Sequence, residues 1–192
     1  MGEGRVRVRN YRVTPVVAYA AVTVPNTFSS GTTISSSQVN ANFTALGNAM
    51  PAVKTASLGA SATLTGSYSN VGSLTVTAPT AGFVQLTATG MAEILGKTNA
   101  GYFFLYVGLT DTSSGIPAEG NFTRFYLTDT ATPAAVTANY NIPYSVHSVF
   151  PVAAGANTFY LVALETGSPS GGSGRLWYNR ITAIFVPGTA LP

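Results

Sequence analysis

The sequence predicts an all-β protein with an extended N-terminal arm, one short α-helix and a C-terminal antiparallel β-sandwich. Seven segments rich in Val, Thr, Tyr and Phe are separated at fairly regular intervals by Gly, Pro, Ser and Asn, which is typical of a sandwich. Apolar residues recur at helical spacing only between Ser35 and Met50. A chain of 192 residues is long enough for one core and too short for two.

The first element is an arm over residues 1–34. Arg5, Arg7, Arg9 and Arg12 oppose a single acid, Glu3, and from Val13 onward five basic and five acidic side chains cancel. The arm therefore carries the whole net charge of +3. Arginine and valine alternate with period two, which favours a β-type arm over a secretion signal. We expect neighbouring subunits to hold it.

The second element is a helix followed by a linker, over residues 35–56. Val39, Phe43, Leu46 and Met50 follow one another at spacings of four, three and four, so they share one helix face. Ser35, Ser36 or Ser37 can cap the start, and Pro51 ends the helix. A helix of about three turns is marginal in water by itself, so this apolar face must pack on something.

The third element is the sandwich, over residues 57–192. Linkers are expected at 66–70, 111–120, 128–138 and 167–174, and strands at 73–77, 83–94, 102–109, 122–127, 144–149, 158–164 and 176–186.

The strand containing residues 102–107 is apolar on both faces. Since a sandwich buries only one face of each sheet, the second apolar face suggests a subunit interface. Tyr102, Phe104 and Tyr106 therefore belong either to the core or to such an interface, and periodicity alone does not decide between them.

The composition argues against enzymatic chemistry and against bound cofactors. Only 8% of residues are charged and 46% are apolar, whereas average soluble domains carry roughly a quarter charged residues. Such a neutral surface suits a chain packed against copies of itself. The absence of cysteine excludes disulfides, thiolate metal sites and a cysteine nucleophile. No apolar run approaches the roughly 20 residues of a membrane span.

The titratable residues form no catalytic or metal-binding motif. Six carboxylates are widely spaced, and His147 is the single histidine. A folded carboxylate pair for glycoside cleavage stays an alternative, because separation in sequence says little about separation in space. A metal bound by histidines would require several copies of the chain around a symmetry axis. We therefore expect no enzyme activity, no metal and no cofactor, and His147 is expected to be an exposed or hydrogen-bonded strand residue.

The segment Phe28–Leu46 resembles a segment near the N-termini of tailed-bacteriophage fibre and appendage proteins, of the form F-x-x-G-T-x-I-x-x-x-x-V-N-x-N-F-x-x-L. It covers about a tenth of the chain. In those proteins it joins an attachment arm to a trimeric distal part, with the helix near the threefold axis. The resemblance implies that Val39, Phe43, Leu46 and Met50 form a trimer seam.

The C-terminal part resembles the jelly-roll module of the complement C1q and tumour necrosis factor families and of phage fibre knobs. The resemblance is carried by residues 78–86, 152–161 and 179–186. Members form trimers through aromatic faces, which implies an interface role for Tyr102, Phe104 and Tyr106. The chain departs from the family in two ways, because no collagen-like stalk precedes the module and no acidic cluster marks a calcium site.

Together these features predict a trimeric structural protein of the virion surface: a decoration protein, head fibre or spike. The basic arm is expected to dock on capsid or tail proteins rather than on nucleic acid, because arms that bind nucleic acid usually carry longer runs of charge. The alternative is a host-receptor-binding adhesin at a tail-fibre tip, with a surface glycan or receptor as partner.

Overall fold

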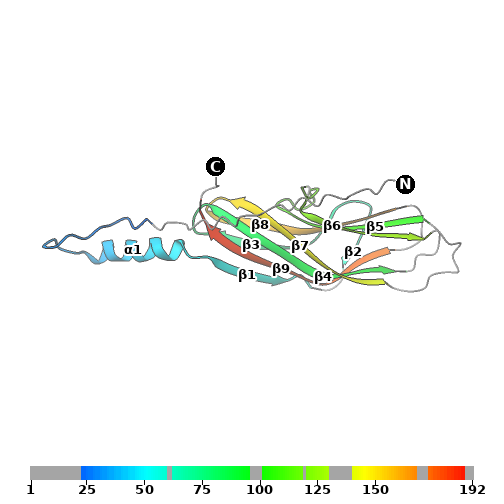
Figure 1. Cartoon of the computed structure of the whole chain (residues 1–192), viewed down its shortest axis with the longest axis horizontal. Coiled ribbons are helices and arrows are strands. Elements are labelled where there is room, and N and C mark those ends of the chain that lie inside the picture. Colours follow the sequence, from blue (N-terminus) through cyan, green and yellow to red (C-terminus); the bar gives the residue numbers. More distant parts are fainter. Residues whose placement is uncertain are drawn as a thin grey trace, which may run out of the picture.

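The computed structural model describes residues 23–59, 62–95, 101–118, 120–129, 140–167 and 173–188. In this part of the chain, one helix precedes two packed β-sheets (Figure 1). The elements are α1 (Ser36–Asn48), β1 (Ala52–Ser57), β2 (Ala62–Thr63), β3 (Ser69–Ala78), β4 (Gly82–Leu95), β5 (Gly101–Thr110), β6 (Phe122–Asp129), β7 (Tyr140–Val152), β8 (Gly155–Gly167) and β9 (Ser173–Pro187).

The two sheets form a jelly-roll-like sandwich. Sheet A has the order β1-β9-β4-β7, with the short β2 also paired to β9, and sheet B has the order β3-β8-β5-β6. Every pairing is antiparallel. Strands distant in sequence lie side by side, as β1 and β9 do. The predicted all-β class with one short helix is confirmed.

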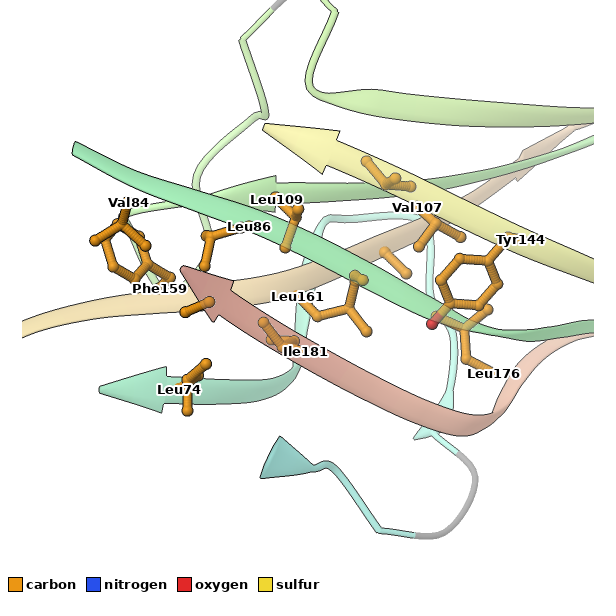
Figure 2. Close-up of a cluster of buried hydrophobic side chains, with 14 of the residues drawn as sticks. Leu74, Val84, Leu86, Val107, Leu109, Tyr144, Phe159, Leu161, Leu176 and Ile181 are labelled. Atoms are coloured by element: carbon orange, nitrogen blue, oxygen red, sulfur yellow. The ribbon is translucent and has the colours of Figure 1, made fainter. Parts of the chain in front are cut away.

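The core lies between the sheets and follows the period-two alternation of the strands. In β4, Val84, Leu86 and Ala88 are fully buried, while the residues between them face outward. In β5 of sheet B, Leu105, Val107 and Leu109 are likewise fully buried. Figure 2 shows side chains of both sheets meeting in this layer; among those labelled are Leu74, Val84, Leu86, Leu109, Phe159, Leu161, Leu176 and Ile181.

All seven predicted strands are present and extend further than predicted, whereas β1 and β2 were not predicted. β1 falls in the stretch expected to be a linker. Its sequence, Ala-Val-Lys-Thr-Ala-Ser, shows little apolar alternation, and only Ala56 packs against the core. Pairing with β9 makes this segment a strand. Lys54 Nζ donates to the Thr75 carbonyl oxygen of β3 at 2.6 Å and so ties the two sheet edges together.

A β-bulge in β9 explains why its alternation is imperfect. Buried positions are even-numbered up to Leu176 and odd-numbered from Asn179 onward, and the register against β4 shifts there. Tyr178 adopts the left-handed conformation with φ 54° and is 79% exposed. The extra residue turns the side chain of Asn179 into the core, where it is 2% exposed.

The buried Asn179 is paired with Tyr144 of β7. The Tyr144 hydroxyl donates to Asn179 Oδ1 at 2.6 Å, and burial raises the pKa of this phenol above its ordinary value, so it stays protonated. Gly90 of β4 makes the contact possible, because a Cβ there would lie 2.7 Å from both Asn179 Oδ1 and the Tyr144 hydroxyl. The Tyr144–Asn179 hydrogen bond in the core therefore requires glycine at position 90.

The loop after β5 folds back onto the outward face of sheet B. The buried Pro117 lies against Gly108, where an added Cβ would collide with the proline ring. Val162, the register partner of Gly108 in β8, is fully buried although it faces away from the core. The described part of the predicted linker at 111–120 therefore covers part of this face.

We predict that Gly90→Ala lowers the free energy of unfolding by about 1–3 kcal/mol, because the new methyl group separates Tyr144 from Asn179 in a packed core. Urea denaturation monitored by tryptophan fluorescence measures the change. Gly66→Ala is the matched control, since no atom lies within 4 Å of its added Cβ; it should change stability by less than about 0.5 kcal/mol. Equal effects of the two variants would contradict this account of Gly90.

Candidate interaction surfaces

The four arm arginines, Arg5, Arg7, Arg9 and Arg12, lie outside the described residues. Their role as an attachment site stays a prediction. The described chain begins at Thr23, and the structure adds the segment that leads from the arm into α1.

The helix forms by local rules. Ser35 is its N-cap and accepts a hydrogen bond from the Gln38 backbone N–H, while the Gln38 side chain accepts one from the Ser35 N–H. This capping box satisfies two backbone donors at once. The helix ends at Asn48, three residues before Pro51, as expected from the exclusion of the helical conformation ahead of proline.

The apolar face of α1 is largely exposed in the described part of the chain. Phe43, Leu46 and Met50 are 68%, 47% and 62% exposed, Val39 is half-buried, and no residue of the helix is buried. Figure 1 shows α1 beyond one end of the sandwich, at the left. Of the four predicted seam residues, Val39, Phe43 and Leu46 lie in α1, whereas Met50 lies two residues beyond its end. Their contact with other copies stays a prediction.

Residues 23–30, here called the strap, run alongside α1 and are clasped to it by two asparagines (Figure 1). The Asn26 backbone N–H donates to Asn42 Oδ1 at 2.9 Å, and Asn42 Nδ2 donates to the Asn26 carbonyl oxygen at 2.8 Å. Asn26 Nδ2 also donates to the Gln38 carbonyl oxygen at 3.2 Å. The side chain of Asn42 thus pairs with the strap backbone as a neighbouring strand would.

Strap and helix together enclose an apolar groove. Its lining residues are Val24 and Phe28 from the strap and Val39, Asn42, Phe43 and Leu46 from the helix. Sequence reasoning missed the contribution of the strap, because a contact between residues about 15 positions apart leaves no periodic signal. The available signal was the spaced pattern of the segment Phe28–Leu46, because it includes Phe28 together with the helix residues.

The outward face of sheet B carries an aromatic strip, formed by Phe104, Tyr106 and Phe122. Ring centroids are 6.2 Å apart for Phe104 and Tyr106 and 5.9 Å apart for Tyr106 and Phe122. The exposed Arg124 places its guanidinium 5.6 Å from the Phe104 centroid, within cation–π range. The predicted double-faced strand is confirmed, because Phe103, Leu105 and Val107 fill the core while Phe104 and Tyr106 face away from it.

Two tyrosines extend this description. Burial, and to a lesser extent Tyr106, raises the pKa of the Tyr68 phenol above its ordinary value. Tyr102 pairs through its backbone with Thr128 of β6, and its side chain lies outside the described part of the structure.

The outward face of sheet A carries a second apolar patch that sequence reasoning missed. Val53, Val149, Ile184 and Val186 are 69%, 60%, 36% and 43% exposed. Val53 is the register partner of Ile184. Gln85 is the register partner of both Ile184 and Val149, so these residues form one row across the sheet. The available signal was the run Ala183-Ile184-Phe185-Val186, which is apolar on both faces just as residues 102–107 are.

A row of hydroxyl groups crosses sheet A next to this patch and ends at His147. Thr55 and Thr182 have their Oγ1 atoms 3.2 Å apart, and Thr182 is the register partner of Thr87. His147 is exposed, with Nδ1 3.0 Å from Thr87 Oγ1 and Nε2 3.1 Å from Ser145 Oγ. The expectation of a hydrogen-bonded strand histidine is confirmed, and Tyr144 and Val146 are the buried neighbours.

The described carboxylates are dispersed. Glu93 lies on the outward side of sheet A and accepts a hydrogen bond from Trp177 Nε1 at 2.5 Å. Glu165 comes from β8 of sheet B and accepts one from the Gly174 N–H of β9 at 2.5 Å, so it links the two sheets. In the described ranges, no three His, Cys, Asp or Glu side chains are grouped to hold a metal ion. Nor does any helix there have the length and apolarity to cross a membrane.

Comparison with known proteins finds a distant similarity to a protein of viral particles. No family model matches the chain, and no curated protein matches it in sequence. A crystal structure of the infectious bursal disease virus VP2 subviral particle is 12% identical, with a TM-score of 0.37, and the match covers 74% of this chain and 34% of that one. The structure of the Gt strain of the same virus is 12% identical, with a TM-score of 0.39 and coverage of 73% and 34%.

The protein spans only about a third of the length of these viral chains. A structure of the T13 viral particle gives a similar alignment, with 10% identity and a TM-score of 0.38. These alignments describe a distant similarity in the course of the backbone. The proposed function does not rest on this similarity.

We predict that Glu165→Gln stabilises the protein increasingly as pH rises. Burial raises the pKa of the Glu165 carboxyl, and the hydrogen bond from Gly174 opposes this shift. The folded protein therefore holds this proton more tightly than the unfolded chain, so stability falls as pH rises from the unfolded pKa through the folded one. Gln keeps an acceptor for Gly174 and does not titrate.

Urea denaturation of both proteins between about pH 4 and pH 7 gives the difference in unfolding free energy across the window in which a carboxyl of raised pKa loses its proton. The advantage of the Glu165→Gln variant should grow across that window. A difference that stays constant or shrinks as pH rises would contradict the assignment.

Proposed function

We propose that the protein is a structural subunit of a virus particle surface. It is a trimeric accessory protein, namely a decoration protein, head fibre or spike, docked on the capsid or tail by its N-terminal arm. Its site of action is the virion. The proposal divides the chain into an attachment arm, a self-associating strap and helix, and a sandwich that forms the distal knob.

The single observation that carries the proposal is the strap–helix unit. The segment that resembles phage appendage proteins, Phe28–Leu46, is clasped to the preceding residues by the Asn26–Asn42 hydrogen bonds. It stands outside the sandwich with its apolar face exposed. A helix of 13 residues without a buried side chain gains little from packing within its own chain. Association with other copies supplies the missing burial.

The knob is proposed to be non-enzymatic and to need no cofactor or metal. The two described carboxylates with defined roles lie on different sheets, and each is occupied by a hydrogen bond that links strands. Glycoside cleavage instead requires two carboxyl groups flanking a substrate bond. His147 is likewise bonded to hydroxyl groups of the sheet and not to a second titratable group.

A second candidate function, an adhesin for a host surface glycan or receptor, is favoured by the aromatic strip. Phe104, Tyr106 and Phe122 present ring faces, and Arg124 is the charged residue among the side chains described on the outward face of sheet B. Flat rings beside a guanidinium suit a ligand with an apolar face and an anionic group. In this reading Phe104 and Tyr106 bind a ligand and do not form a subunit interface.

We predict that Arg5→Glu combined with Arg7→Glu abolishes attachment to particles lacking this protein, because the docking charge is reversed while the sandwich is untouched. Co-sedimentation with such particles measures attachment, and circular dichroism verifies the fold. Arg124→Glu combined with Arg180→Glu is the matched control, since both arginines are exposed on the sandwich. Attachment that survives the arm substitutions, or is lost equally in the control, would refute the arm as anchor.

A separate test addresses the adhesin. Tyr106→Ala should abolish binding to an array of carboxylate-bearing host glycans while leaving co-sedimentation with particles unchanged. Thr75→Ala is the control, because Thr75 is exposed on the edge strand β3 and lies on the same face of sheet B. An array on which the wild-type protein binds nothing would exclude glycan binding by the aromatic strip.

A further inference from the structure

We infer that the groove between the strap and α1 receives Phe43 of the partner subunit, so that the strap forms part of the subunit interface. This inference rests on the proposed self-association and adds to it a specific binding site. The seam predicted from sequence contained helix residues alone.

The groove is built to hold an apolar side chain. Five of its six lining residues are apolar, and the sixth, Asn42, turns its amide to the strap backbone. Val24 and Phe28 form one wall and are 44% and 42% exposed. Leu46 lies on the opposite wall and is 47% exposed. Water in such a site gains almost no hydrogen bonds, so an apolar occupant that displaces it stabilises the complex.

The charge distribution favours a second copy as the occupant. No Asp, Glu, Lys or Arg occurs between Val13 and Val53, so the strap, the helix and their surroundings are uncharged. A rotational axis brings identical residues close together, and like charges there would repel one another. Interfaces between different proteins commonly use complementary charges for specificity. A segment without charged residues avoids this repulsion and therefore suits contact with an identical copy.

The helix geometry selects Phe43 as the inserted residue. The spacing of four, three and four places Val39 and Leu46 at d positions and Phe43 and Met50 at a positions of a heptad. In a parallel assembly equivalent residues lie at the same height along the axis. The groove is lined at the height of Phe43, whereas Met50 lies beyond the end of α1 and does not line it. Phe43 is also the largest exposed side chain of the helix.

Hydrogen bonds hold the strap in place before any partner binds. The Asn26–Asn42 clasp fixes the strap two residues before Phe28, and Asn26 Nδ2 holds the Gln38 carbonyl oxygen as well. Immobilising the wall before association reduces the entropy lost on binding. The clasp is thus a positioning element for the groove.

Cross-linking between chains tests the inference directly, because the protein contains no cysteine. A tagged Phe28→Cys chain and an untagged Phe43→Cys chain are unfolded together, refolded and treated with a short bis-maleimide. The expected product is a covalent dimer of one tagged and one untagged chain. The matched control replaces the second chain with Thr44→Cys, an exposed position one residue further along α1 that does not line the groove. It should give roughly tenfold less product, because adjacent residues point in different directions around a helix.

The mass of the refolded assembly separates the possible failures. A trimer without enriched Phe28–Phe43 product would overturn the groove inference and leave the proposed trimer in place. A monomer by sedimentation equilibrium would overturn the self-association itself. In a second measurement, Phe28→Ser should weaken association by about tenfold or more, whereas Phe28→Leu should retain it. Equal association of the two variants would also overturn the inference.

Discussion

The structure depends on one constraint: each strand has two faces, and the sandwich buries only one of them. The inner faces of β4, β5 and β9 fill the core with aliphatic and aromatic side chains. Where a strand is apolar on both faces, the outward apolar side chains remain at the surface unless a loop covers them, as happens at Val162. The aromatic strip on sheet B and the Val53, Val149, Ile184 and Val186 patch on sheet A are two surfaces of this kind. Both are therefore candidate contact surfaces for the same physical reason.

The strap and helix are held together differently from the sandwich. Their local conformation is determined by short-range hydrogen bonds, namely the Ser35–Gln38 capping box and the Asn26–Asn42 clasp. These bonds define a shape, but each contributes only about 1 kcal/mol net. Burial of apolar area stabilises a fold more strongly, and the described chain provides almost none of it for α1. The shape of the unit is therefore defined within one chain, and the proposed association with other copies would bury its apolar face.

Much of the architecture was predictable because it depends on local patterns. Alternation located seven of the nine described strands, and spacing with a cap and a proline located the helix within one or two residues. β1 escaped prediction because its small residues show no apolar alternation and its strand character comes from pairing with β9. The change from even-numbered to odd-numbered buried positions at Tyr178 and Asn179 was not predicted either. It results from a bulge, which depends on the register of β9 against Gly90 and its neighbours on β4.

The sequence by itself determined the all-β class, the helix with its apolar stripe, the segregation of positive charge into the arm and the second apolar face of residues 102–107, because each depends on composition or on short periodicities. Only the tertiary structure decided which face is inside, which residues from distant strands form the sheet A patch, and that Val24 and Phe28 join α1 in a groove. Those features arise from contacts between segments separated along the chain, and such contacts are fixed by the best packing of the whole fold and not by any local pattern.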